Sequence, residues 1–224
     1  MPSSRLAALP SKLFLFVAIL FPRHFSRGRK KAAPRPISTH GKVGRVKQLD
    51  RIQHRLREAQ SAFLRAADAV PADQWTAKPV AEAWSAAELV AHLVILERAV
   101  LGGADRISQK TPKPVPFLKR RHLPLWLVQA RIVRRKSPIP LDPSLIGNKE
   151  DMLGELRAAR ERTMAFLEET RARDLSAYCW PHAFLGMLDI YEWFEMLAAH
   201  HVRHTKQIRE IASRLPKVVG ISQN

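Results

Sequence analysis

Three histidines lie where helical spacing would turn them toward the interior of a protein. His200 and His204 stand four residues apart in a long amphipathic segment, and on a helical wheel both fall near its apolar stripe. Side chains at positions i and i+4 have Cβ atoms about 5–6 Å apart, so two imidazoles can bind one divalent ion. His92, between Leu89 and Leu96 on the apolar face of another predicted helix, could supply a third nitrogen. Three protein ligands leave positions open for water or substrate, as in a catalytic metal site.

The surroundings of these histidines support a site rather than ordinary packing. Imidazoles buried among Trp193, Leu197 and Ile208 would be costly without polar partners. The nearest carboxylates on that helix, Glu195 and Glu210, fall on other faces, so a histidine–carboxylate pair within the helix is excluded.

Other residues compete for a role in this site. His201 is an alternative ligand, because i and i+3 also share a helix face. His182, in the turn before the last helix, could approach the mouth of the site or be a solvated turn histidine, and the second is favoured. Cys179 is the single cysteine, which excludes an internal disulfide and a cysteine-rich zinc site. It could be a redox group or an auxiliary ligand, but a small buried apolar residue is favoured.

Four amphipathic segments must position these residues. Apolar residues at steps of three and four predict helices over residues 48–70, 85–103, 149–169 and 188–215. A capping box of Ser85 and Glu88 begins the second helix, Asn148 caps the third, and Gly102 and Gly103 loosen the end of the second. No stretch alternates with period two, so we expect no strands and a turn-like connection over 171–186. The sequence therefore predicts an all-α four-helix bundle.

The net charge of +18 is concentrated in two segments. Residues 1–47 hold eleven lysines and arginines and no acid, so we expect a basic extension before a domain over 48–215 and a short tail over 216–224. Its apolar run, residues 13–21, is too short to span a bilayer, which takes about 20 residues in a helix. A disordered or over-extended start is favoured over a membrane-directed leader or a basic binding arm.

The second basic segment is an insertion between the second and third helices. Residues 106–141 contain ten lysines and arginines, no acid and repeated prolines, and residues 122–136 could form a short amphipathic helix. Its apolar side would cover the core, with its arginines in solvent. The alternative is that this insertion binds nucleic acid or an anionic membrane.

Two motifs together resemble the DinB/YfiT-like superfamily over residues 48–215. They are Trp-Ser-x-x-Glu-x-x-x-His-Leu at 84–93 and His-x-x-x-His-x-x-Gln-Ile at 200–208. The resemblance implies a four-helix bundle that holds a divalent metal on His92, His200 and His204, with Gln207 and His182 as candidates for the site mouth. Residues 181–182 are Pro-His where the family has His-Pro, which puts a role for His182 in doubt.

The resemblance also implies a kind of chemistry. Relatives include transferases that use a low-molecular-weight thiol such as bacillithiol or mycothiol, and others are described as metal-dependent hydrolases. We therefore expect a cytoplasmic enzyme, a possible homodimer, with Zn²⁺ or Ni²⁺ and a small-molecule substrate. Two alternatives stay open: a non-enzymatic bundle that binds nucleic acid or membrane through its basic insertion, and a purely structural metal site.

Overall fold

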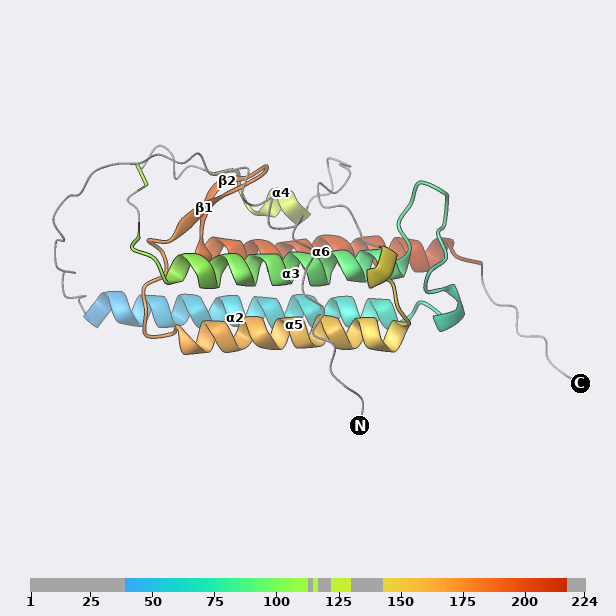
Figure 1. Cartoon of the computed structure of the whole chain (residues 1–224), viewed down its shortest axis with the longest axis horizontal. Helices are drawn as coiled ribbons and strands as arrows, with labels where there is room; N and C mark the ends of the chain where they lie inside the picture. Colours follow the sequence, from blue (N-terminus) through green and yellow to red (C-terminus); the bar gives the residue numbers. More distant parts are fainter. Residues whose placement is uncertain (1–38, 113–114, 117–121, 130–142, 217–224) are drawn as a thin grey trace, which may run out of the picture. The chain divides into compact units, whose positions relative to one another are not determined.

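Four long helices make up most of the protein (Figure 1). The computed structural model describes residues 39–112, 115–116, 122–129 and 143–216. The long helices are α2 (Thr39–Asp68), α3 (Ala86–Ser108), α5 (Lys149–Glu169) and α6 (Ile190–Arg214). The short elements are η1 (Ala72–Gln74), α4 (Trp126–Gln129), η3 (Pro143–Leu145), β1 (Cys179–His182) and β2 (Gly186–Asp189). The predicted all-α bundle is confirmed.

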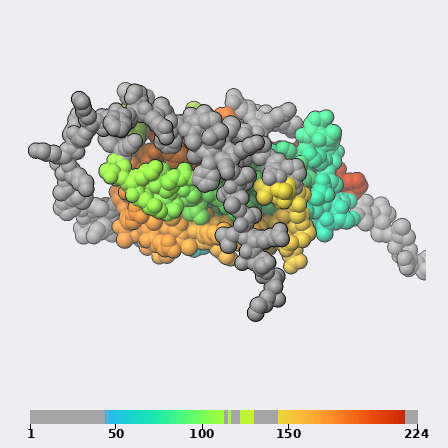
Figure 2. Space-filling model, viewed as in Figure 1, coloured from blue at the N-terminus to red at the C-terminus, as the bar shows by residue number. Residues whose placement is uncertain are grey.

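The four long helices form two pairs (Figure 1). The two helices of each pair are parallel, and the two pairs run in opposite directions. Arg51 in the first half of α2 pairs with Glu195 near the start of α6, and Gln74, after α2, donates to the carbonyl of Pro216, after α6. α2 and α6 are therefore parallel. α3 and α5 run the other way, and Figure 2 shows them side by side on one face of the bundle. α4, which lies between α3 and α5 in the sequence, packs against α6.

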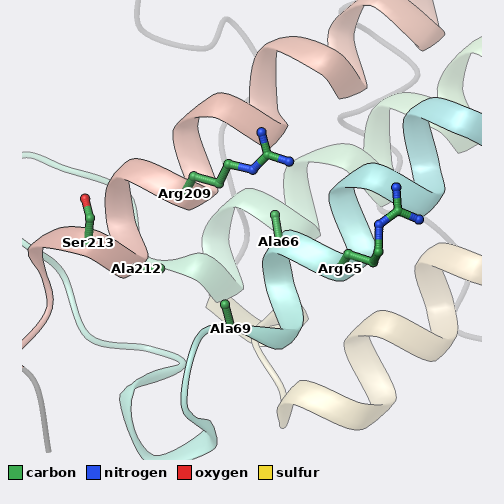
Figure 3. Close-up of a pocket in the computed structure, with 6 residues that line it drawn as sticks. All are labelled: Arg65, Ala66, Ala69, Arg209, Ala212 and Ser213. Atoms are coloured by element: carbon green, nitrogen blue, oxygen red, sulfur yellow. The ribbon is translucent and has the colours of Figure 1, made fainter.

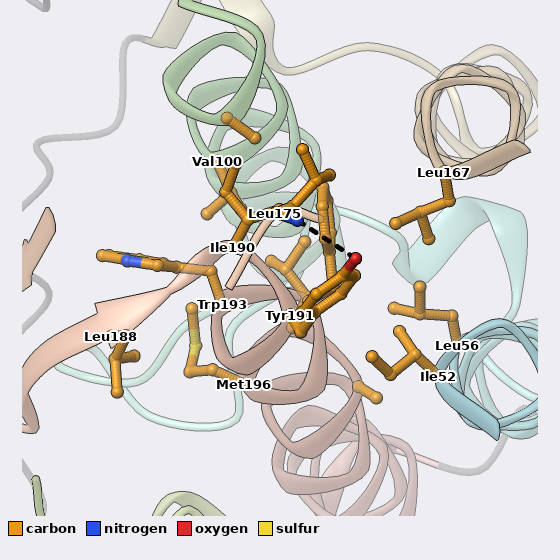
Figure 4. Packing of buried hydrophobic residues seen from close by; sticks show 14 of the residues in the cluster. Ile52, Leu56, Val100, Leu167, Leu175, Leu188, Ile190, Tyr191, Trp193 and Met196 are labelled. Atoms are coloured by element: carbon orange, nitrogen blue, oxygen red, sulfur yellow. Dashed lines mark hydrogen bonds between the residues drawn. The ribbon is translucent and has the colours of Figure 1, made fainter. Parts of the chain in front are cut away.

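The apolar core forms two clusters along the bundle. The first joins the start of α2 and of α6 to the ends of α3 and α5, and Figure 4 shows part of it around Tyr191, whose hydroxyl accepts from the amide of Leu175. The second joins the end of α2 and of α6 to the starts of α3 and α5. Most buried polar side chains lie between the two clusters, in the middle of α3, α5 and α6. They include His92, Glu97, Arg160, Thr163, His201, His204 and Thr205.

The helix starts follow the capping chemistry of the sequence. Ser85 accepts from the amide of Glu88, whose carboxylate accepts from the amide of Ser85, and Asn148 accepts from the amide of Asp151. Both predicted caps are confirmed. A second capping box, formed by Asp189 and Glu192, begins α6 and was not predicted.

Two predicted helix boundaries are wrong. α2 begins at Thr39, nine residues before position 48, because no proline interrupts the chain between Pro36 and Pro71. α3 continues through Gly102 and Gly103 to Ser108. A Cβ atom at Gly103 would lie 3.4 Å from the ring of Trp180, so this glycine allows the close packing of β1 on the helix.

The expectation of no strands is also wrong. Residues 179–189 form a short antiparallel hairpin, in which Cys179 pairs with Asp189 and His182 with Gly186. Gly186 has a φ of 103°, a conformation that favours glycine. Strands of four residues are too short for a period of two to stand out, and Pro181 further hides the pattern.

Parts of the basic segments lie outside the described residues. These are 1–38, 113–114, 117–121, 130–142 and 217–224, so the predicted leader, arm or disordered start, the tail and the arginines at 131, 134 and 135 lie there. Within α4 and beside it, Leu125 and Val128 pack against the first core cluster, as predicted. None of the described helices is both long and apolar enough to cross a membrane.

Candidate metal centre

Three histidine rings from two helices meet inside the bundle. His92 Nε2 of α3 lies 3.0 Å from His200 Nε2 of α6, and His204 Nε2 lies 2.8 Å from the same atom. One nitrogen from each of the three rings lies within 4.8 Å of the other two. His92 and His204 are buried and His200 is half-buried. The predicted convergence of these three imidazoles is confirmed.

Neighbouring side chains orient two of the three rings. The Nδ1–H of His204 donates to Oε1 of Gln207 at 2.9 Å, which leaves the lone pair of Nε2 directed at the cluster. The ring of Trp84 meets the ring of His92 edge to face, with centroids 5.1 Å apart. Gln207 lies about one turn after His204 on α6, and its hydrogen bond to His204 makes it part of the site.

The cluster is built to stay uncharged. Burial lowers the pKa of His92 to about 4. Burial is also the largest cause that lowers the pKa values of His200 and His204 well below the ordinary value, and the neighbouring histidines add to it. A neutral imidazole carries a single N–H group. Nε2 of His200 therefore cannot donate a hydrogen bond to both of the Nε2 atoms that face it.

The donor set and its spacing fit a divalent ion. Nitrogens about 2.0–2.1 Å from one Zn²⁺ stand about 3.3 Å apart in tetrahedral geometry and about 2.9 Å apart at right angles. The two short separations of 3.0 and 2.8 Å differ from these by a few tenths of an ångström. Neutral imidazoles with facing lone pairs are ligands for Zn²⁺ and Ni²⁺.

His182 is held in the hairpin rather than in solvent. Its Nδ1 accepts from the amides of Phe184 and Leu185, and its ring centroid lies 5.0 Å from that of Trp193. Burial lowers the pKa of His182 to about 4. The ring of His182 is not one of the three that converge. A positive charge on that ring would still lower the pKa of His200. A role at the site mouth stays a prediction.

His201 faces away from the three-histidine cluster. It lies 1% exposed beside the guanidinium of Arg160, whose Nη2 is 3.2 Å from His201 Nδ1, and its Nδ1 also lies 3.2 Å from the carbonyl of Leu197. The alternative in which His201 replaces a ligand is therefore not supported. Cys179 is half-buried at the start of β1 and its thiol donates to the carbonyl of Ser176, so it too lies outside the cluster.

A second buried polar cluster, formed by Glu97 and Arg160, was not predicted from the sequence. Nη2 of Arg160 on α5 donates to Oε2 of Glu97 on α3 at 3.0 Å, and Nε of Arg160 lies 2.8 Å from Oε1. Burial raises the pKa of Glu97 and lowers that of Arg160, and their attraction opposes both shifts. Helical spacing indicated this burial, because Glu97 follows the apolar Leu93 by four residues and Arg160 follows Leu156 by four. Each charged residue therefore falls on the apolar face of its helix.

The fold and this centre define a class of protein: a four-helix bundle with a three-histidine centre on its second and fourth long helices. A model of the DinB superfamily matches residues 55–208, a span that includes the three histidines and Gln207. The chain therefore belongs to the DinB superfamily.

One curated relative is the uncharacterized protein YuaE of Bacillus subtilis (strain 168). It is 28% identical to this chain over 142 residues, which cover 62% of this chain and 84% of YuaE. No solved structure matches the chain.

Proposed function

We propose that the protein is a metal-dependent enzyme in which His92, His200 and His204 bind one divalent ion, Zn²⁺ or Ni²⁺. The observation that carries the proposal is the meeting of three Nε2 atoms from α3 and α6 inside the bundle. No carboxylate or thiol of the described residues joins that group. Three protein ligands leave coordination positions for a small molecule, which is typical of catalytic rather than structural sites.

The chemistry that this site supports is nucleophilic attack. A bound divalent ion lowers the pKa of a thiol or water, so that a nucleophile is present at neutral pH. Three neutral ligands contribute no negative charge, and the charge of Arg203 acts on His200 and His204 as well. Both features favour an anionic partner, such as the thiolate of a low-molecular-weight thiol, which would attack a small electrophile.

The chain's own residues orient and enclose the site. Gln207 fixes the tautomer of His204, and Trp84 packs on the ring of His92. Arg203, between His200 and His204 in the sequence, donates to the carbonyl of Val128 and so ties α4 to α6 beside the site. These contacts keep the imidazoles in place before a ligand arrives, so little ordering is needed on binding.

Metal analysis tests the assignment of the ligands. Wild-type protein is stripped with a chelator, reconstituted with Zn²⁺ or Ni²⁺, and compared with His204→Ala and with the control His54→Ala, an exposed histidine of α2. We expect one ion per chain in the wild type and the control, and a clear loss in His204→Ala. Equal metal content in all three proteins would rule out the assignment.

Turnover tests the reaction class. The reconstituted enzyme is assayed with a panel of low-molecular-weight thiols and electrophiles, and with a panel of esters. We expect thiol transfer that requires the metal and is lost in His204→Ala. Metal-dependent melting with no turnover on either panel would instead indicate a structural site.

A further inference from the structure

The surface seam between α2 and α6 carries different charges at its two ends. At one end of the seam, Glu195 in the first turns of α6 faces two arginines in the middle of α2, with Arg51 Nη2 3.3 Å from Oε1 and Arg55 Nη1 4.0 Å from Oε2. Fourteen residues further along each helix, Arg65 takes the place of Arg51 and Arg209 takes the place of Glu195. Two cations therefore face each other where the first end has an ion pair.

A groove of about 490 Å³ lies between these two arginines. Figure 3 shows Arg65 rising from α2 and Arg209 from α6, with the small side chain of Ala66 between them. The rest of the lining is Ala69, Ala212 and Ser213. The residues between the two arginines have small side chains, so both guanidinium groups can reach a ligand in the groove.

Two nearby acids have other ion-pair partners. Glu210 pairs with Arg214, and Glu58, in the adjoining hollow along α2, pairs with His54. The hydroxyl of Ser213 donates to the carbonyl of Glu210. Within the described part of the chain, no carboxylate lines the groove and neither Arg65 nor Arg209 has an ion-pair partner. The two guanidinium groups are thus the donors that the groove offers.

We propose that this groove binds the phosphate group of a small soluble molecule between Arg65 and Arg209. A guanidinium group presents two parallel N–H donors that match two phosphate oxygens, and two such groups can share one dianion. The groove is open to solvent, so there is room beside the two guanidinium groups for the group that carries the phosphate.

A soluble ligand fits this surface better than a membrane. Membrane-binding faces combine cations with exposed apolar side chains. The exposed large apolar residues of the described chain are Val46, Val80, Leu123, Trp126, Leu145 and Phe184, and none of them lines the groove.

The groove is distinct from the metal centre. Arg209 follows His200 by nine residues, and Ser213 follows His204 by nine. Nine residues turn a helix by about 900°, which places the groove on the opposite side of α6 from the histidines. The proposal therefore does not rest on the enzymatic function.

Titration with inorganic phosphate at constant ionic strength tests the proposal. The full-length, metal-loaded protein is followed by calorimetry, beside Arg65→Gln, Arg209→Gln and the control Arg162→Gln, an exposed arginine of α5. We expect millimolar binding that weakens at least about fivefold in each groove variant and is unchanged in the control. Arg209→Lys keeps the positive charge but loses the two parallel N–H donors, so we expect an intermediate loss of phosphate affinity.

A second arm separates the groove from the metal. Phosphate could also bind a metal ion, so the titration is repeated on His204→Ala, where binding at the groove must persist. Binding that disappears in His204→Ala, or that is equal in the Arg65→Gln and Arg162→Gln proteins, would overturn the proposal. Binding to vesicles of phosphatidylglycerol without any response to inorganic phosphate would overturn it as well, because it would assign the arginines to a membrane surface.

Discussion

Two polar clusters lie side by side in the middle of the bundle, and adjacent residues of α6 belong to each. His201 contacts Arg160, which is paired with Glu97, so this cluster contains its own cation and anion. His200 contacts only other imidazoles at its Nε2, and no opposite charge is present. A buried polar group needs a partner. The first cluster has opposite charges within it, whereas under the proposed function the second cluster obtains its positive charge from a bound cation.

This difference separates stability from function. The Glu97–Arg160 pair joins α3 to α5, and the contact with His201 adds α6, so three helices meet at one buried ion pair. The three-histidine cluster joins only α3 and α6 directly. We therefore expect changes in the first cluster to act on folding and changes in the second to act on metal binding.

The largest effect is expected from breaking the internally paired cluster. Arg160→Leu leaves the carboxylate of Glu97 buried without a counter-charge, which costs about 3–5 kcal/mol in the free energy of unfolding. Denaturant unfolding measures it, with Arg162→Leu on the exposed side of α5 as the control. Replacing both partners by leucine should recover part of the loss, because no unpaired charge remains. A loss of less than about 1 kcal/mol in Arg160→Leu would contradict the structural role.

The second effect concerns metal-linked stability. Metal at 100 times its Kd stabilises a folded protein by about 2.7 kcal/mol. We expect this gain in the wild type on addition of Zn²⁺ or Ni²⁺ and its loss in His200→Ala. Thermal unfolding with and without metal measures it. The Glu97→Leu/Arg160→Leu variant should keep the gain if it folds, and a loss there equal to that in His200→Ala would erase the distinction between the clusters.

A smaller effect is expected from the group that orients His204. Gln207→Ala removes the acceptor of the His204 Nδ1–H, and second-layer contacts of this kind contribute about 10–100-fold to metal affinity. Competition with a coloured chelator measures the change. Lys206→Ala, the exposed neighbour on α6, is the control and should bind metal as the wild type does. Equal affinities for Gln207→Ala and the wild type would remove Gln207 from the site.

The smallest effect comes from His182, which belongs to neither cluster. Burial lowers its pKa to about 4 from an ordinary value of 6.5, so the unfolded chain binds the proton more readily. Its share of stability is present above pH 6.5 and is lost as the pH falls toward 4, and about 1–2 kcal/mol of it is lost by pH 5. His182→Gln should flatten the loss of unfolding free energy in that range. Identical pH profiles would show that the ring is not buried in solution.

Helical periodicity was enough to predict the bundle and to place three histidines on apolar stripes, and the resemblance to the DinB/YfiT-like superfamily singled them out as one set. His92, His200 and His204 each fall on an apolar stripe, and the arithmetic of 100° per residue needs no tertiary information. Charged residues are ordinarily expected in solvent, so Glu97 and Arg160 were missed although their spacing places them beside Leu93 and Leu156. Their burial depends on each other across two helices, which the pattern of one helix does not show.

The hairpin was missed for a different reason. It depends on the pairing of Cys179 with Asp189 and on the left-handed conformation of Gly186, and each strand has four residues. The start of α6 was less hidden, because Asp189 and Glu192 form a capping box with the same spacing as Ser85 and Glu88.

The central claim is that the three-histidine cluster holds a metal ion, and anomalous diffraction from crystals of the reconstituted protein tests it most directly. We predict one peak at the absorption edge of the added metal, about 2.0–2.1 Å from Nε2 of His92, His200 and His204. A peak at other residues, or rings that keep their mutual contacts with no metal between them at saturating concentration, would contradict the account.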